Sequence, residues 1–262
     1  MTLLQTLLHA CGLDEARCGA CHMPYSPPDS PLCPDCMAAL ERAPALCGLC
    51  GAPLPLHAPD GGACAICLAS PPPWRRLYAV GPYEGLLRDL ALRAKYRGDR
   101  SVCRLLGLLL AEKLAARRMD GLRPELLLPM PLHPARLRRR GFNQCQEIAE
   151  PVSRLLGIPR CPHLARRIAA TPPQTGMRRN ERLRNLEQAF SVDPAVQGRR
   201  LLILDDTITT GTTLRRLALS LLQAGAAEVA AAAVAVVLPR RSAFPGPDDA
   251  PSAVGGTLSF FS

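Results

Sequence analysis

Four Cys-x-x-Cys pairs lie within the first 67 residues, and they restrict the folds open to this part of the chain more than any other feature. Nine of the twelve cysteines precede residue 68. A reducing compartment does not preserve such pairs as disulfides, whereas thiolates two residues apart are typical ligands of a tetrahedral zinc ion. Redox-active pairs usually occur singly, so four in succession favour metal binding. The pairs are Cys18/Cys21, Cys33/Cys36, Cys47/Cys50 and Cys64/Cys67.

Eight thiolates form two complete tetrahedral sets, which predicts two structural zinc ions in a small double zinc ribbon over residues 1–70. The simplest assignment is sequential, with two neighbouring pairs on each ion. An interleaved arrangement, in which the first pair shares an ion with the third, is also compatible with the spacing. A segment this short has little core of its own, so metal ligation would supply most of its folding free energy. We therefore expect its core to be separate from that of the following domain.

The second part of the chain has the pattern of an α/β domain with a mainly parallel sheet and flanking helices. Three prolines at 71–73 are expected to form a stiff linker, because consecutive prolines favour extended geometry. Strand and helix periodicities then alternate, as in parallel α/β folds. We expect strands at 75–80, 125–130, 201–204 and 228–238, and helices at 84–96, 104–118, 142–156 and 214–224. The domain is predicted to span 74–240, followed by a weakly ordered tail at 241–262.

Composition excludes several classes of protein. The chain carries 32 Lys and Arg against 22 Asp and Glu, a formal charge of +10, but only 4% of its residues are aromatic. So few rings argue against RNA-recognition modules and oligonucleotide-binding barrels, which stack bases on aromatic side chains. No uncharged apolar run approaches the length of a membrane-spanning helix, and the first residues lack the basic segment of a secretory signal. We therefore expect a cytoplasmic protein without a membrane span.

The segment at 201–214 combines an apolar strand, the adjacent carboxylates of Asp205 and Asp206, and a Thr/Gly turn that leads into a helix. Amides at such a turn and at the helix N-terminus can bind a phosphate, and threonine hydroxyl groups add donors. The carboxylates would repel that phosphate unless they bind ribose hydroxyl groups or organise Mg²⁺. Phosphoribosyl pyrophosphate satisfies both requirements. A simple capped helix is the alternative, but one cap does not require five hydroxyl groups around Gly211.

This turn resembles the phosphoribosyl-pyrophosphate loop of type I phosphoribosyltransferases. The segment 128–144, with its arginine run before Gly141-Phe142-Asn143-Gln144, is similar to the signature of the ComF family of competence-associated proteins, which are related to amidophosphoribosyltransferases. The double cysteine ribbon and the arginine-rich segment 166–190 also resemble that family, so the resemblance covers nearly the whole chain. One departure is Thr207, where an aliphatic residue is more usual.

The resemblance implies a role for each matched residue. Asp205 and Asp206 would bind the ribose 2′ and 3′ hydroxyl groups. The pyrophosphate side would be formed by Arg136 and Arg140, with Lys95 as a further candidate, and Mg²⁺ would accompany the ligand. Arginine suits this role because its guanidinium group binds phosphate oxygens bidentately. The 5′-phosphate would be bound by Thr209, Thr210, Gly211, Thr212 and Thr213.

Two functions remain open. The first is a ComF-type protein that binds phosphoribosyl pyrophosphate and handles incoming single-stranded DNA during natural transformation, with the competence machinery as partner. Between residues 136 and 184 there are twelve Arg against three Glu, a net charge of +9, and such a surface can follow DNA phosphates. The second is an active phosphoribosyltransferase for a small nucleophile. Glutamine-driven amination is disfavoured, because the glutaminase half of the related enzymes needs an N-terminal cysteine and this chain starts Met1-Thr2.

Overall fold

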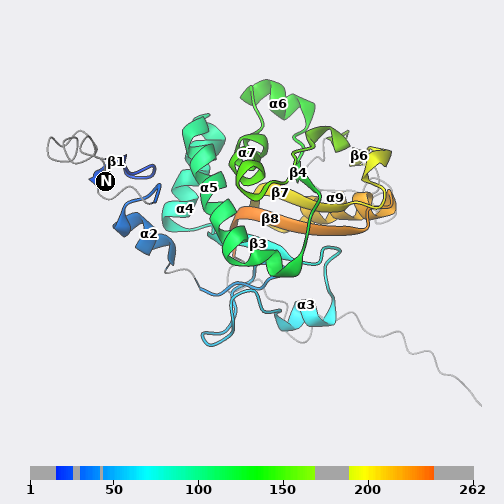
Figure 1. Ribbon diagram of the computed structural model, residues 1–262, viewed down its shortest axis with the longest axis horizontal. Helices are drawn as coiled ribbons and strands as arrows, with labels where there is room; N and C mark the ends of the chain where they lie inside the picture. The colour runs from blue at the N-terminus through cyan, green and yellow to red at the C-terminus, as the bar shows by residue number, and fades with distance from the viewer. Residues whose placement is uncertain (1–15, 26–29, 42–43, 169–188, 239–262) are drawn as a thin grey trace, which may run out of the picture.

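A four-stranded parallel sheet forms the centre of the protein (Figure 1). The computed structural model describes residues 16–25, 30–41, 44–168 and 189–238. Neighbouring strands of the sheet follow the order β3-β8-β7-β4, and all three pairings are parallel. The strands are β3 (Leu77–Pro82), β8 (Glu228–Val236), β7 (Arg200–Ile208) and β4 (Leu126–Pro129). The expected α/β class with a parallel sheet is therefore confirmed.

The two central strands are apolar because both of their faces are covered. In β8 every residue after Glu228 is buried, and the strand consists there only of valine and alanine. A strand covered on both faces has a continuous apolar run rather than an alternating one. In β7 the run Leu201 to Leu204 is buried in the same way. The register pairs Leu201 with Val229 and Ile208 with Val236, so the carboxyl ends of the two strands are level.

Helices cover both faces of the sheet. Helices α4 (Gly85–Tyr96), α5 (Arg100–Ala116) and α7 (Gln144–Leu156) lie on one face, and α9 (Thr212–Gln223) lies on the other (Figure 1). Helices α5 and α7 approach each other closely at Gly107, where a Cβ atom would clash with the carbonyl oxygen of Ile148. The short helix α6 (Pro134–Arg140) follows β4 and ends at Gly141.

Smaller elements complete the described residues. Two antiparallel pairs flank the main sheet: β1 (Ala16–Arg17) with β2 (Pro24–Tyr25), and β5 (Ala165–Arg167) with β6 (Phe190–Val192). Helices α2 (Pro34–Glu41) and α3 (Ala65–Ala69) belong to the cysteine-rich segment. Single 3-10 turns occur at Arg118–Gly121, Pro162–Leu164 and Pro194–Val196. None of the helices in the described ranges has the length and hydropathy needed to cross a membrane.

The expected strands and helices are all present, but most of their ends are shifted by one to four residues, and three of these shifts are informative. Strand β7 does not end at Leu204, because its ladder with β8 continues to Ile208, so both carboxylates lie inside the strand. Helix α9 starts two residues earlier than expected, directly after Gly211. Helix α5 starts at Arg100, because the side chain of Asp99 accepts a hydrogen bond from the amide of Val102 and caps it. The expected tail at 241–262 lies outside the described residues.

The cysteine-rich segment shares its hydrophobic core with the α/β domain. One continuous cluster of buried side chains contains Leu32 and Leu46 together with Leu77 of the edge strand and Leu105 of α5. Polar contacts add to this packing, since Leu77 N donates to Gly48 O at 2.8 Å and Lys113 Nζ donates to Asp60 Oδ2 at 2.8 Å. The expectation of separate cores is therefore wrong. The physical reason is that the small segment buries its apolar side chains against β3 and α5 instead of against itself.

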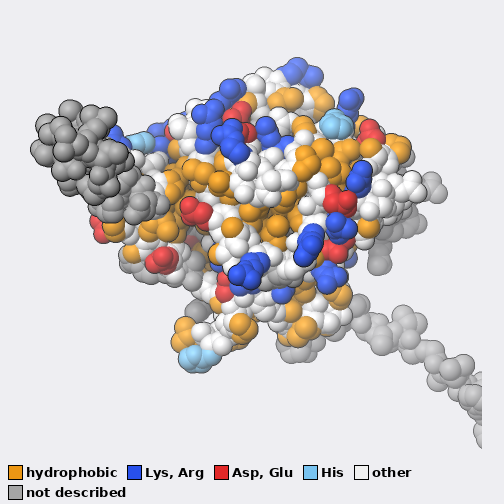
Figure 2. All heavy atoms as spheres, in the orientation of Figure 1, with side chains coloured by type: hydrophobic (Ala, Val, Ile, Leu, Met, Phe, Trp, Pro, Cys, Tyr) orange, Lys and Arg blue, Asp and Glu red, His pale blue; other side chains and the backbone are white. Residues whose placement is uncertain are grey.

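Positive charge forms more than one group on the surface, and Figure 2 shows Lys and Arg side chains both at the top and at the lower right of the view. Figure 2 shows Lys and Arg side chains gathered over helices α4, α5 and α6, at the top of the view. The side chains of Arg97, Arg100, Arg138 and Arg139 are all exposed there. Such a surface attracts polyanions and distinguishes this side of the molecule electrostatically.

Candidate functional site

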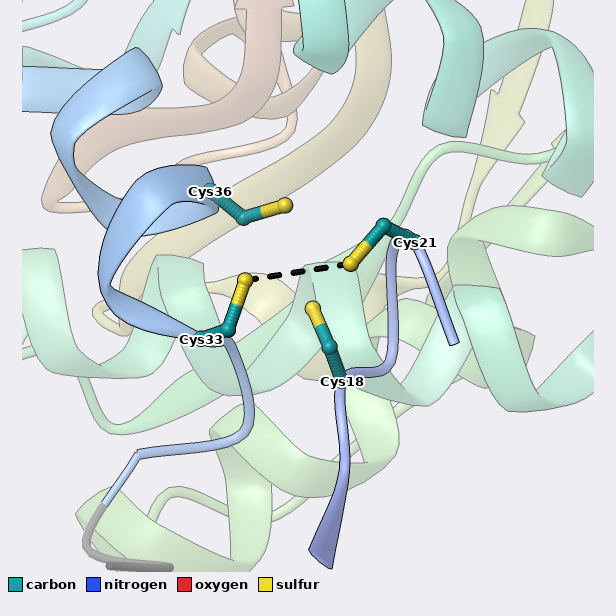
Figure 3. Close-up of side chains that lie close together, drawn as sticks. All are labelled: Cys18, Cys21, Cys33 and Cys36. Atoms are coloured by element: carbon teal, nitrogen blue, oxygen red, sulfur yellow. Dashed lines mark hydrogen bonds between the residues drawn. The ribbon is translucent and has the colours of Figure 1, made fainter. Parts of the chain in front are cut away.

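The first four cysteines form one cluster that fits a tetrahedral metal ion. Their sulfur atoms all lie within 4.8 Å of one another, and Cys21 Sγ is 3.7 Å from Cys33 Sγ. Figure 3 shows the side chains of Cys18, Cys21, Cys33 and Cys36 pointing toward a common centre. Zinc–sulfur bonds of about 2.3 Å in a tetrahedron place the sulfur atoms about 3.8 Å apart. The observed spacing therefore matches zinc.

The last two pairs form a second cluster of the same kind. Sulfur atoms of Cys47, Cys50, Cys64 and Cys67 also lie within 4.8 Å of one another, with 3.7 Å between those of Cys50 and Cys64. The sequential assignment is thereby confirmed, and the interleaved alternative does not occur. Gly48 is required in this turn, because a Cβ atom there would clash with the carbonyl oxygen of Gly61.

Backbone amides prepare both clusters for metal binding. Burial raises the pKa of the Cys18 thiol, but hydrogen bonds from the amides of Cys21, Cys33 and Ala20 outweigh it and lower the pKa to about 6. In the same way, burial is outweighed at Cys47, where nearby amides lower the pKa to about 7. Thiolates are the form that binds zinc, so each cluster contains at least one cysteine that readily ionises.

Strand β7 presents the two adjacent carboxylates near its carboxyl end. Asp205 Oδ1 accepts a hydrogen bond from the amide of Asp206 at 2.9 Å, and Asp206 Oδ1 accepts one from the amide of Thr207 at 2.8 Å. Burial, and next the charge of Asp206, raise the pKa of Asp205 well above its ordinary value. Placing a second negative charge on the Asp205–Asp206 pair therefore costs free energy. A cation such as Mg²⁺, or hydroxyl donors, would lower that cost.

Helix α7 supplies polar side chains to this pair from a distant part of the chain. Gln144 is buried, and its Nε2 donates a hydrogen bond of 3.0 Å to Asp206 Oδ2. Arg140 in turn donates to Gln144 Oε1 at 3.1 Å, so two hydrogen bonds link Arg140 to the carboxylates. The buried Asn143 fixes the start of α7: it accepts from the amide of Cys145 and donates to Met130 O at the end of β4.

Cys145 is a site residue that the sequence analysis did not identify. Its Sγ lies 3.6 Å from Asp205 Oδ1 and donates to it, and the three acidic groups of Cys145, Asp205 and Asp206 lie within 4.8 Å of one another. Burial, and then the two carboxylates, raise the pKa of Cys145 well above its ordinary value. The thiol is therefore neutral and acts as a hydrogen-bond donor to Asp205. The sequence signal that could have indicated this role is the position of Cys145, directly after the segment 128–144 that resembles the ComF signature.

A group of three arginines lies beside the carboxylates. Burial lowers the pKa of Arg167 in β5, and the positive charges of Arg136 and Arg216 lower it further. The Nε atom of Arg216 is buried and has no hydrogen-bond partner among the described residues. A buried donor without an acceptor and a cluster of like charges both favour the binding of an anion. Arg216 was not expected from the sequence, because only the fold brings α9 next to the β5–β6 pair.

The loop after β7 is open to solvent and leads into α9. Gly211 has a φ of +70°, in the left-handed region that favours glycine, and it is the N-cap residue of α9. Thr209, Thr210 and Thr212 are exposed, and Thr210 Oγ1 lies 2.9 Å from Thr212 Oγ1. The N-cap residue has no side chain, and the first amide of α9, that of Thr212, donates a long hydrogen bond of 3.4 Å to Thr210 Oγ1. Among the described residues the next two amides have no partner, so they can bind an anion. We call residues 209–213 the phosphate loop.

The remaining basic candidate is less closely connected. Lys95 lies near the end of α4, with its Nζ 5.7 Å from the centroid of the Tyr96 ring. In the described residues no hydrogen bond or ion pair connects it to the Asp205–Asp206 pair, so its role in pyrophosphate binding stays a prediction. His133 caps α6 by accepting a hydrogen bond of 3.2 Å from the amide of Ala135.

A parallel sheet, a carboxylate pair near the end of a central strand and a Thr/Gly loop at a helix N-terminus define a phosphoribosyltransferase fold. Residues 143–255 match the family of the phosphoribosyl transferase domain. The chain is 37% identical over 214 residues to DNA utilization protein YhgH of Salmonella typhimurium, covering 81% of this chain and 93% of that protein. It is also 34% identical over 206 residues to Competence protein F of Haemophilus influenzae, covering 76% and 87%. This chain belongs to the ComF family.

A more distant relative agrees with this assignment. Competence protein ComFC of Bacillus subtilis is 27% identical over 211 residues, covering 76% of this chain and 81% of that protein. The resemblance to the ComF family and the phosphoribosyltransferase-like fold, both expected from the sequence, are thereby confirmed.

Proposed function

We propose that this protein binds phosphoribosyl pyrophosphate with Mg²⁺ and handles single-stranded DNA that enters the cell, in the cytoplasm and together with competence machinery. One observation carries the first part: the Asp205–Asp206 pair lies one short loop ahead of the N-terminus of α9, where the second and third amides have no partner among the described residues. Carboxylates accept hydrogen bonds from ribose hydroxyl groups, while the helix N-terminus and the threonine hydroxyl groups bind the 5′-phosphate. A sugar phosphate has both groups on one molecule.

The surrounding arginines support a pyrophosphate group on the same ligand. Arg140 is connected to Asp206 through Gln144, and Arg136 lies near Arg167 and Arg216. A pyrophosphate anion would relieve the repulsion within this arginine group and supply an acceptor for Arg216. Mg²⁺, when bound by the Asp205–Asp206 pair and the ligand oxygens, would neutralise the remaining charge.

A basic strip that we assign to DNA begins next to this site. It consists of Lys95, Tyr96, Arg97, Arg100, Arg138, Arg139 and Phe142. Arg100 lies 5.7 Å from the centroid of the Phe142 ring, and a Cβ atom on Gly98 would lie 3.6 Å from that ring, which joins the two halves of the strip. Tyr96 is 70% exposed.

The exposed ring of Tyr96 and the half-buried ring of Phe142 lie among cations, which suits single-stranded nucleic acid, because bases stack on rings while cations bind phosphates. The strip borders Arg140 and therefore leads toward the carboxylate pair. The relatives named for DNA utilization and competence agree with a DNA partner.

We also propose that each cysteine cluster holds one structural zinc ion, which requires the reducing environment of the cytoplasm.

The function is tested by calorimetric titration of the metal-loaded protein with phosphoribosyl pyrophosphate, with and without Mg²⁺, and then with single-stranded DNA present. We expect Mg²⁺-dependent binding and a separate, salt-dependent affinity for DNA. Pyrophosphate release is measured in parallel against a panel of nucleobases. Release with one base would instead assign a phosphoribosyltransferase with a small acceptor. Absence of any Mg²⁺-dependent affinity would contradict the proposal.

A further inference from the structure

Trp74 lies between the second cysteine cluster and the phosphate loop. It is the only tryptophan in the chain, and its side chain is 7% exposed. Its Nε1 donates a hydrogen bond of 2.6 Å to the carbonyl oxygen of Leu49, which is located between the metal-binding candidates Cys47 and Cys50. One edge of the indole is therefore attached to the turn that the metal would hold in place.

The six-membered ring of the indole lies near Gly211 of the phosphate loop. A Cβ atom on Gly211 would lie 4.0 Å from Cη2 of Trp74 and 4.0 Å from a methyl group of Ile208. Gly211 is the left-handed residue from which α9 begins. Trp74 and the end of β7 are therefore the nearest neighbours on the side of Gly211 where a Cβ atom would project.

A second contact connects the same cluster to the base of the loop. A Cβ atom on Gly51 would lie 2.8 Å from both γ-carbons of Val236, so the turn after Cys50 packs tightly on the end of β8. Val236 is the register partner of Ile208, and Val237 N donates to Ile208 O at 2.8 Å. The second cluster thus reaches the start of the phosphate loop through Trp74 and through β8.

The first cluster has different neighbours. A Cβ atom on Gly19 would meet Leu105 of α5, and Arg93 of α4 donates a hydrogen bond of 2.9 Å to the carbonyl oxygen of Ala20. In the described part of the chain these contacts lead to helices α4 and α5, and none of them involves Trp74. Structural ordering of the second cluster can therefore affect the phosphate loop, whereas the first cluster has no such contact with the loop among the described residues.

We propose that Trp74 is a positioning residue through which the second cysteine cluster controls the phosphate loop. A metal ion on Cys47, Cys50, Cys64 and Cys67 fixes the Leu49 carbonyl, the carbonyl fixes the indole, and the indole fixes Gly211. Loss of that ion weakens the binding of phosphate ligands, whereas loss of the ion in the first cluster does not. The inference rests on the proposed function, because the ligand of the loop is taken to be a sugar phosphate.

The test compares one cysteine from each cluster. Purified Cys50→Ser and Cys21→Ser proteins each lose one metal ion by metal analysis and are checked by circular dichroism for an intact α/β domain. Ribose 5-phosphate is then titrated by calorimetry. We expect Cys50→Ser to weaken its affinity at least about tenfold and Cys21→Ser to change it less than about twofold. Equal effects of the two substitutions, or an unchanged affinity in Cys50→Ser, would overturn the inference.

Substitutions of Trp74 test its hydrogen bond to Leu49 and its packing near Gly211 separately. Trp74→Phe keeps a ring against Gly211 but lacks the donor to Leu49, and we expect affinity to fall about two- to tenfold. Trp74→Leu removes the ring as well and should cost more. Ribose 5-phosphate should also shift the fluorescence of Trp74 in the wild type and not in Cys50→Ser. A fluorescence response that survives in Cys50→Ser would show that the loop and the cluster are uncoupled.

The wild type distinguishes failure of this inference from failure of the proposed function. If the wild-type protein binds neither ribose 5-phosphate nor phosphoribosyl pyrophosphate, the proposed function is wrong and the coupling has no ligand to act on. If the wild type binds and Trp74→Leu binds equally well, only the coupling is wrong.

Discussion

Gln144 donates a hydrogen bond of 3.0 Å to the carboxylate of Asp206, although the two residues are 62 positions apart. The same side chain accepts a hydrogen bond from Arg140, so its orientation is set from both ends. This arrangement joins the start of α7 to the end of β7 and places a guanidinium group next to the Asp205–Asp206 pair. The candidate site is therefore built from two segments, and each can be tested separately.

Replacing both carboxylates should abolish binding of phosphoribosyl pyrophosphate. A charge-assisted hydrogen bond contributes about 1.5–3 kcal/mol, so Asp205→Asn with Asp206→Asn should weaken binding by roughly two to four powers of ten. Calorimetry with Mg²⁺ measures the change, and metal analysis and circular dichroism verify the fold. Retained affinity in the double variant would mean that ribose is bound elsewhere.

Arg140→Ala should weaken binding of phosphoribosyl pyrophosphate more than binding of ribose 5-phosphate. The reason is that Arg140 is assigned to the pyrophosphate side and not to the 5′-phosphate. Arg154→Ala is the matched control, because Arg154 is exposed on α7 and pairs there with Glu150. Lys95→Ala, measured in the same titrations, tests the remaining basic candidate. Equal losses for the two ligands in Arg140→Ala would contradict the assignment.

Asp205→Asn should stabilise the ligand-free protein at neutral pH. The pKa of Asp205 is raised in the folded state, so the folded protein binds more protons than the unfolded chain above the ordinary aspartate value of about 3.9. Stability from this group is therefore present at low pH and is lost as pH rises. Urea unfolding at pH 4 and pH 8 should show a gain from Asp205→Asn that is larger at pH 8. The exposed Asp89→Asn should show no such difference.

Metal removal should destabilise the whole chain rather than the cysteine-rich segment alone. The sequence suggested that the second domain would remain largely intact, but Leu32 and Leu46 belong to the same buried cluster as Leu77 and Leu105. We expect two zinc ions per chain by metal analysis. Chelation should lower the melting temperature by about 10 °C or more in one transition. A separate unfolding transition at lower temperature, with the main transition unchanged, would show that the cysteine-rich segment has its own core.

The basic strip predicts two different effects on DNA binding. Arg138→Ala with Arg139→Ala should weaken binding of single-stranded DNA and reduce the salt-dependence slope by about 1.4, because each lost phosphate contact releases about 0.7 counterion. Tyr96→Ala should weaken binding about tenfold with little change in slope, since stacking is not ionic. Fluorescence anisotropy at several salt concentrations measures both. Arg154→Ala is again the control, and an equal loss in that variant would indicate a non-specific charge effect.

Features that depend on neighbouring residues were predictable before the fold was known. The four cysteine pairs, the apolar strand before Asp205, and the Thr/Gly turn before α9 each depend on spacings of a few residues. Thiolate pairs, strand burial and helix starts are local properties, so they can be read without the fold. The α/β class was therefore predictable and is confirmed, while Asp205, Asp206 and 209–213 remain the predicted site residues.

Relationships between residues far apart in the chain became visible only in the folded protein. The sequential pairing of the cysteine clusters, the extension of β7 to Ile208 and the shared core all follow from packing against segments far away in the chain. The same holds for Cys145 beside Asp205, Arg216 beside Arg167, and Trp74 beneath Gly211. Burial against partners tens or hundreds of residues distant sets these positions, and no local spacing encodes which partner a side chain will meet.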